Sequence, residues 1–235
     1  MNSNNYSNDE NSYVEMLITA KELIHIPETY VHSTVRVSAK QKEKGCSDVK
    51  QAIEIYLESL KYNRNTASLL FTIARCYSLL RDLKIFENEA EGMKYGDQAL
   101  SWAKRAIEIE PNVYYFHTFL GYFYIIYLLD YEASAEEYRF AIAQNPQDAT
   151  VFANAAAMLY GSPDSPVTLK EAIGWLECAV QLAPDNSDYL ESLGILYYKA
   201  GRNQDALKTW VAALSCPKPL QKGHLQEIKK TLGIE

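Results

Sequence analysis

The feature that most constrains the fold is the stretch from Asn186 to Pro217, which encodes two amphipathic helices around a glycine-centred turn. A helical hairpin of this size has an apolar face that it cannot bury alone, so similar hairpins must stack against it. The stretch therefore predicts an array of stacked helix pairs. Its apolar and small positions are Leu190, Leu193, Gly194 and Tyr197 in the first helix and Ala206, Trp210 and Ala213 in the second.

Weaker copies of this hairpin precede it along the chain. Pro111, Pro146 and Pro184 end three of them and follow each other at intervals of 35 and 38 residues. In each leading helix, apolar, aromatic or small residues recur at i, i+3, i+4 and i+7, which places them on one helical stripe. Small residues on a stripe, such as Gly121 and Gly194, are expected to let the second helix of the pair approach closely. The three earlier stripes are Leu70, Ile73, Ala74 and Tyr77; His117, Leu120, Gly121 and Tyr124; and Phe152, Ala155, Ala156 and Leu159.

A period this close to about 34 residues is the signature of the tetratricopeptide repeat (TPR). The chain resembles this family over about residues 28–217, and the best match to its motif is the set of positions named above for Asn186 to Pro217. The resemblance implies an all-α, right-handed solenoid of about five stacked antiparallel helix pairs. The first predicted pair lacks the Gly and Tyr of the family's leading helix, and the second, third and fourth pairs carry insertions.

The two ends of the chain are expected to differ from the array. The first residues are rich in Asn, Ser and acidic side chains with little apolar surface to bury, which predicts disorder. Ser12 and Glu15 form the pattern of a capping box, and Pro27 stops the helix that follows. The predicted organisation is a disordered tail over residues 1–11, a capping helix over 12–26, the TPR-like solenoid over 27–217 and a C-terminal capping helix over 218–235.

The first two pairs of the array are irregular. The first is predicted as a helix from Pro27 to Lys44, ended by Gly45, and a second helix from Asp48 to Tyr62. In the second pair, an insertion over Ile85 to Gly96 either lengthens the second helix or forms a protruding loop. Further on, Thr168 and Glu171 form another capping-box pattern that restarts the chain as a helix after an extended turn.

Composition excludes several classes of partner. The chain has 48% hydrophobic and 23% charged residues with a net charge of -7, which indicates a soluble globular protein and disfavours nucleic acid as a partner. No window approaches the roughly 20 apolar residues that a membrane-spanning helix needs. The scattered cysteines, Cys46, Cys76, Cys178 and Cys216, favour free thiols in a reducing compartment, and the first residues do not match the pattern expected of a secretory signal. We therefore expect a cytoplasmic protein that neither inserts into membranes nor binds nucleic acid.

In a solenoid of the family that the chain resembles, the first helices line the concave side. The side chains on their second face, away from the packing stripe, are the candidate binding residues, and they are mostly aromatic, apolar or small. This composition suits an apolar or helical peptide anchored by large side chains. The alternative is that the aromatic side chains pack against neighbouring helices or a terminal helix. The candidate groove consists of Phe71, Arg75, Tyr115, Thr118, Tyr122, Ile125, Asn154, Tyr160, Glu191 and Tyr198.

Chaperone-binding members of the family clamp a terminal carboxylate with Lys, Asn and Arg along this face. Only Arg75 and Asn154 match that pattern here, while Asp188 and Glu191 would repel a carboxylate. The sequence therefore disfavours such a clamp.

Catalytic motifs are lacking: no GxxxxGK[ST] loop, GxGxxG turn or HExxH pair is present. The four histidines are not spaced as metal ligands, and His117 falls where the family places a packing aromatic. We expect no catalytic residue, no cofactor and no metal site, and a partly buried structural role for His117. The predicted function is a non-catalytic scaffold, an adaptor or assembly factor that binds a partner segment in the concave groove. The alternative is a structural subunit that self-associates or packs permanently into a larger complex.

Overall fold

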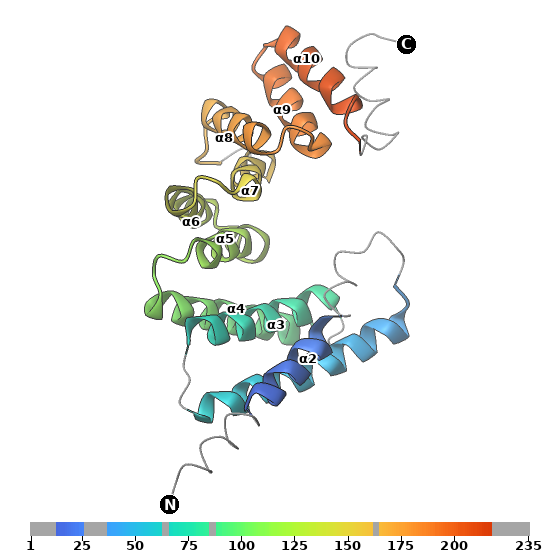
Figure 1. Ribbon diagram of the computed structural model, residues 1–235, viewed down its shortest axis with the longest axis vertical. Coiled ribbons are helices and arrows are strands. Elements are labelled where there is room, and N and C mark those ends of the chain that lie inside the picture. Colours follow the sequence, from blue (N-terminus) through green and yellow to red (C-terminus); the bar gives the residue numbers. More distant parts are fainter. Residues whose placement is uncertain (1–12, 26–36, 63–65, 85–87, 162–164, 218–235) are drawn as a thin grey trace, which may run out of the picture. The chain divides into compact units, whose positions relative to one another are not determined.

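The computed structural model describes residues 13–25, 37–62, 66–84, 88–161 and 165–217. Every regular element in these ranges is helical (Figure 1). The chain divides into two compact units, Met1–Asn112 and Val113–Glu235. The first unit contains a helix over residues 13–25, α2 (Ala39–Ser59) with the 3-10 turn η1 (Leu60–Tyr62), α3 (Ala67–Leu83) and α4 (Glu89–Ile109). The second contains α5 (Tyr114–Phe123), the π-helix η2 (Tyr124–Leu128), α6 (Tyr131–Gln144), α7 (Ala149–Gly161), α8 (Leu169–Leu182), α9 (Ser187–Lys199) and α10 (Asn203–Leu214).

The helix over residues 13–25 packs beside α2 in the first unit. Its Ala20 and Ile24 belong to the same buried cluster as Val49 and Ile53 of α2 and Ile73 of α3. Helix α3 in turn packs on both α2 and α4. The core of this unit therefore lies between all of its helices.

The predicted break at Gly45 is wrong. Helix α2 passes through Gly45 without interruption, and Gly45 and Cys46 are both buried in it. A glycine inside a helix costs only about 1 kcal/mol relative to Ala, which burial of the neighbouring apolar side chains offsets. The helix instead begins at a capping box that the sequence reading missed: the Ser38 side chain accepts from the Gln41 amide, and Gln41 Oε1 accepts from the Ser38 amide at 3.0 Å. The predicted start at Pro27 lies outside the described residues.

The insertion after α3 lengthens the second helix, the first of its two predicted outcomes. Helix α3 ends at Leu83, and Lys84 takes the left-handed conformation with φ 54°. Asn88 caps α4, which then runs for 21 residues. Its added first turns are tied to α2, because Lys50 Nζ of α2 lies 3.6 Å from Glu91 Oε1. Within α4, the Tyr95 hydroxyl donates to the same carboxylate.

The second unit is a stack of three helix pairs: α5 with α6, α7 with α8, and α9 with α10. In two of the pairs, α5 with α6 and α9 with α10, the seam is narrow, as the glycines on their stripes predict. A Cβ atom at Gly194 would lie 2.3 Å from Trp210 Nε1, and one at Gly121 would lie 2.9 Å from Tyr138 Cδ2. Helix α6 also packs on α7 and α8 on α9, which joins the pairs into one core.

Two features of this unit depart from the regular pattern. After Phe123 the chain continues as the π-helix η2. This helix is followed by Leu129, which takes the left-handed conformation with φ 55°. At α8 only half of the predicted capping box forms: Thr168 Oγ1 accepts from the Glu171 amide at 3.1 Å. The Glu171 carboxylate instead binds Arg139 of α6, with Nε at 2.9 Å and Nη2 at 3.2 Å. The predicted tail over 1–11, the Ser12 cap and the C-terminal helix over 218–235 lie outside the described residues.

Candidate functional site

The structure distributes the predicted groove residues over both units. Phe71 and Arg75 lie on α3 in the first unit, and the other eight lie in the second. Phe71 is mostly buried, with 9% of its surface exposed. Arg75 is exposed. The side chain of Tyr160 lies outside the described part.

Three of the predicted residues in the second unit are large, half-exposed aromatics, and together we call them the tyrosine face. Tyr115 is 43% exposed, Tyr122 48% and Tyr198 44%. All three lie on first helices of their pairs, Tyr115 and Tyr122 on α5 and Tyr198 on α9. Tyr115 and Tyr122 are seven residues apart, which places them two turns apart on the same side of α5.

The surroundings hold two of these rings in place. The Tyr115 ring lies edge-on to Tyr114 and Phe116, with centroid separations of 5.7 Å and 4.7 Å. The Tyr198 ring packs against Trp210, with centroids 6.1 Å apart. Each therefore presents part of a fixed aromatic surface to solvent.

The predicted groove positions of α7, the first helix of the middle pair, carry side chains that are small or only partly buried. Ala153 and Asn154 of α7 are half-buried and Ala157 is exposed. The Tyr189 hydroxyl of α9 lies 3.4 Å from Thr150 Oγ1 of α7, so the two first helices are neighbours. The remaining predicted residues, Thr118, Ile125 and Glu191, are also half-buried. The predicted groove positions of this unit thus include both exposed rings and small side chains.

His117 has the packing role expected from its position. It is 8% exposed, its ring centroid lies 4.1 Å from that of Phe140, and Nδ1 lies 2.6 Å from Glu137 Oε2. These contacts join α5 to α6. No group of three or more His, Cys, Asp or Glu among the described residues is arranged to hold a metal ion.

The cysteines behave as packed thiols. All four are free, and Cys46 and Cys76 are buried in the core of the first unit. Burial raises the pKa of the Cys46 thiol, and the Glu91 carboxylate raises it further while the Lys50 ammonium opposes both. A raised pKa keeps this thiol protonated and poorly nucleophilic.

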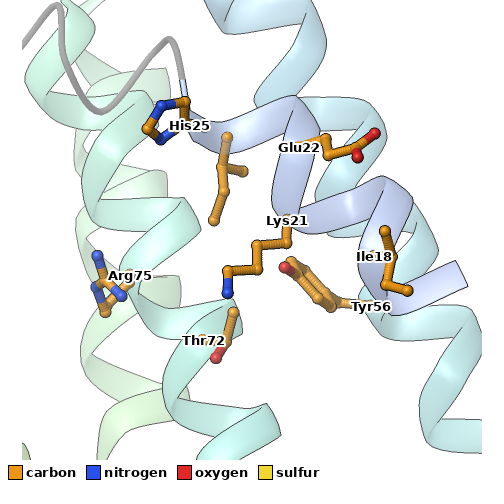
Figure 2. Close-up of a pocket in the computed structure, with 8 residues that line it drawn as sticks. Ile18, Lys21, Glu22, His25, Tyr56, Thr72 and Arg75 are labelled. Carbon is orange, nitrogen blue, oxygen red and sulfur yellow. The ribbon is translucent and has the colours of Figure 1, made fainter. Parts of the chain in front are cut away.

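The sequence reading missed a pocket of about 630 Å³ in the first unit. It opens between the 13–25 helix, α2 and α3, and its lining includes Ile18, Lys21, Tyr56 and Arg75 (Figure 2). The sequence predicts this helix as a cap, a role that assigns no function to its polar side chains. The spacing of Lys21 and His25, four residues apart on one helix face, was the signal available in the sequence.

None of the described helices has both the length and the apolar character that a membrane crossing requires.

No protein-family model matches the sequence, and comparison with curated proteins finds no significant relative. Solved structures do resemble it. The crystal structure of MamA is 17% identical, covers 83% of this chain and 99% of its own, and gives a TM-score of 0.58. The structure of MamA 41-end from Desulfovibrio magneticus RS-1 is 15% identical, covers 75% of this chain and 93% of its own, and gives a TM-score of 0.57. The crystal structure of YrrB, described as a TPR protein with an unusual peptide-binding site, is 14% identical. It covers 82% of this chain and 92% of its own, with a TM-score of 0.58.

The chain has a TPR-like fold. The resemblance inferred from the repeat motif is thus confirmed at the level of the fold, as an all-α solenoid of packed helix pairs. At these identities the likeness concerns the fold and leaves the ligand to be argued from the surface of this chain.

Proposed function

We propose that this protein is a non-catalytic interaction scaffold, an adaptor or assembly factor, that holds a segment of another protein against the tyrosine face. The observation that carries the proposal is the exposure of Tyr115, Tyr122 and Tyr198 on first helices of the second unit. Tyrosine supplies a large contact area with few rotatable bonds, and for this reason it is frequent among residues that dominate binding energy.

The shape of the surface indicates the kind of segment it binds. Protruding rings beside small side chains such as Ala153 and Ala157 suit a helical or extended peptide with one or two bulky apolar residues, which would enter between the rings. The similarity to YrrB supports this choice, because the description of that structure names a peptide-binding site. The cytoplasmic location expected from the free thiols stays a prediction, as does the absence of nucleic acid among the partners.

A second candidate function is supported by a different surface. Helix α10 exposes an apolar stripe formed by Leu207, Val211 and Leu214, which are 38%, 54% and 38% exposed. These residues recur at i, i+4 and i+7 and therefore share one side of the helix. A stripe of this kind suits self-association or permanent packing into a larger complex.

One capture experiment tests the proposal and separates it from the second candidate. Wild-type protein is immobilised and used to capture partners from cell extract, beside the double variant Tyr122→Ala and Tyr198→Ala and the control Val211→Ala. We expect the double variant to capture at least about tenfold less partner than the wild type, because it lacks two anchoring aromatic side chains. The control should capture as much partner as the wild type. Full retention by the double variant with loss by Val211→Ala would overturn the scaffold proposal in favour of association through α10.

A further inference from the structure

The first helices of the second unit carry little charge. No Asp, Glu, Lys or Arg occurs in α5 or α7. In α9, Asp188 and Glu191 belong to the first two turns, and Lys199 is the last residue. The first helices thus offer a partner two carboxylates at one end of α9 and one cation at the other.

The two carboxylates share one side of α9 with Tyr198 of the tyrosine face. At about 100° per residue, Asp188, Glu191 and Tyr198 fall within an arc of roughly 80° around the helix axis, and we call them the α9 stripe. Asp188 and Tyr198 are exposed, and Glu191 is half-buried. Lys199 lies about 100° round the helix from Tyr198. The stripe therefore has negative charge at one end and an exposed aromatic ring at the other.

The arginines of this unit form ion pairs elsewhere. Arg139 pairs with Glu171, which joins α6 to α8, and Arg202 pairs with Asp205 at the start of α10. Within the part of the chain that the structure describes, the exposed Asp188 carboxylate takes part in no ion pair. The acidic end of the α9 stripe therefore keeps at least one carboxylate that a cation of a partner can reach.

The charge of the whole unit has the same sign as the stripe. Residues 113–217 contain twelve acidic and five basic side chains. A negative field of this kind attracts a positively charged segment and steers its approach, whereas an acidic segment is repelled. Charge complementarity thus favours a basic partner for the tyrosine face.

The length of the α9 stripe indicates the spacing of side chains in the partner. Tyr198 lies about 10 Å from Glu191 and about 15 Å from Asp188 along the helix axis, at 1.5 Å per residue. An extended segment advances about 3.3 Å per residue, so these distances correspond to roughly three to five residues. We propose that the tyrosine face binds an extended basic segment of another protein. This segment places a bulky apolar side chain against Tyr198 and an Arg or Lys, roughly three to five residues away, against the carboxylates of the α9 stripe. The inference rests on the proposed function and adds to it the charge and spacing of the bound segment.

The test uses the full chain and synthetic peptides, and binding is followed by fluorescence polarisation. The probe is a capped, fluorescently labelled peptide of two arginines, three serines and one tryptophan in this order, and a second probe has the reversed order. One matched peptide replaces both arginines with glutamine, and another replaces the tryptophan with alanine. The protein variants are Asp188→Asn with Glu191→Gln, and Tyr198→Ala. A control of equal charge change is Glu132→Gln with Glu136→Gln, at two exposed positions of α6.

We expect the arginine peptide, in the better of its two orders, to bind at least about tenfold more tightly than the glutamine and alanine peptides, and to bind more weakly as salt is raised. Asp188→Asn with Glu191→Gln should lower the affinity for the arginine peptide at least about tenfold and leave that for the glutamine peptide unchanged. Tyr198→Ala should weaken the binding of both peptides, whereas the α6 control should bind like the wild type. Circular dichroism checks that each variant folds, and the comparison of peptides on the wild type needs no variant.

Four results would overturn the inference. The first is no binding of the arginine peptide, in either order, up to about 1 mM. The second is equal affinity for the arginine and glutamine peptides with a loss in Tyr198→Ala, which would leave the scaffold proposal standing without the basic partner. The third is a loss in Asp188→Asn with Glu191→Gln but none in Tyr198→Ala, which would separate the basic site from the tyrosine face. The fourth is at least about tenfold tighter binding after Lys222→Gln with Lys229→Gln, because the α9 stripe would then be the site of the chain's own C-terminal residues.

Discussion

Apart from α5 and the π-helix η2, the second unit is built from helices of nearly equal length, whereas the first unit is built from helices of unequal length. In the second unit α6 to α10 span 12 to 14 residues each. In the first unit α2 and α4 span 21 residues and α3 spans 17. This difference in helix length goes with different packing contacts in the two units.

The regular unit depends on narrow seams. Gly121 faces Tyr138, and Gly194 faces Trp210, in equivalent places of two pairs. The Trp210 indole also donates to the Glu191 carbonyl oxygen at 3.2 Å, so the ring cannot move aside without losing that bond. The irregular unit instead ties its extended α4 to α2 through the ion pair of Lys50 with Glu91, and its unequal helices leave a pocket. The pocket thus lies in the unit whose helices depart from the regular repeat.

The largest effect on stability is expected from a substitution in a narrow seam between two helices. Gly194→Ala would place a methyl group 2.3 Å from Trp210 Nε1 and should lower the free energy of unfolding by about 1–3 kcal/mol. The matched control is Gly174→Ala in α8, where no atom lies within 4 Å of the new Cβ. That variant should gain up to about 1 kcal/mol from helix propensity. Urea denaturation followed by circular dichroism measures both, and equal effects of the two alanines would show that the seam is not under steric constraint.

A second prediction compares a partly buried tyrosine–glutamate hydrogen bond in each unit. The Tyr197 hydroxyl donates to Glu177 Oε1 at 2.7 Å, and the Tyr95 hydroxyl donates to Glu91. Burial, and then the Glu177 carboxylate, raise the pKa of Tyr197 to about 12. Burial and Glu91 also raise the pKa of Tyr95, but there Lys50 opposes the shift.

Because the folded state favours the protonated phenol, stability from Tyr197 is fully present below its unfolded pKa of about 10 and is lost as the pH rises toward about 12. Tyr197→Phe should lower stability by about 1 kcal/mol at neutral pH and remove part of the alkaline loss. Tyr95→Phe should remove a smaller part of the loss of stability at alkaline pH, because Lys50 stabilises the ionised phenol of Tyr95. Hydrogen exchange of α9 and α4 between neutral pH and about pH 10.5 measures the two units separately. A larger alkaline change for Tyr95→Phe would contradict the comparison.

The smallest effects concern helix caps. Ser38 forms a reciprocal capping box in the first unit, whereas Thr168 in the second forms only one of the two bonds. We expect Ser38→Ala and Thr168→Ala each to cost about 1 kcal/mol, with the larger cost at Ser38. Arg139→Ala, which removes the exposed partner of Glu171, should cost at most about 1 kcal/mol. Thermal unfolding of the three variants ranks them, and a cost at Arg139 above that at Thr168 would mean that the ion pair, and not the cap, fixes the start of α8.

Prediction from sequence succeeded where a local pattern recurs and failed where a distant helix intervenes. The stripes around Gly121 and Gly194 were found because a period of 3.6 residues and a repeat near 34 residues are both visible in one dimension. The break at Gly45 was predicted from a local rule for helix ends, and packing of α2 against its neighbours overrode that rule. In the same way Glu171 was assigned to a cap because Arg139, 32 residues earlier, is not a neighbour in sequence.

The sequence by itself determined the helix-pair plan, the small residues at the seams and the half-exposed tyrosines of α5 and α9, because each depends on the side-chain order within a single helix. Only the tertiary structure decided that α4 absorbs the insertion and that the 13–25 helix packs beside α2. It also decided that Lys21 and Arg75, 54 residues apart in the chain, line one pocket. The physical reason is that helical periodicity selects which face of a helix is buried, whereas packing between helices selects which faces meet.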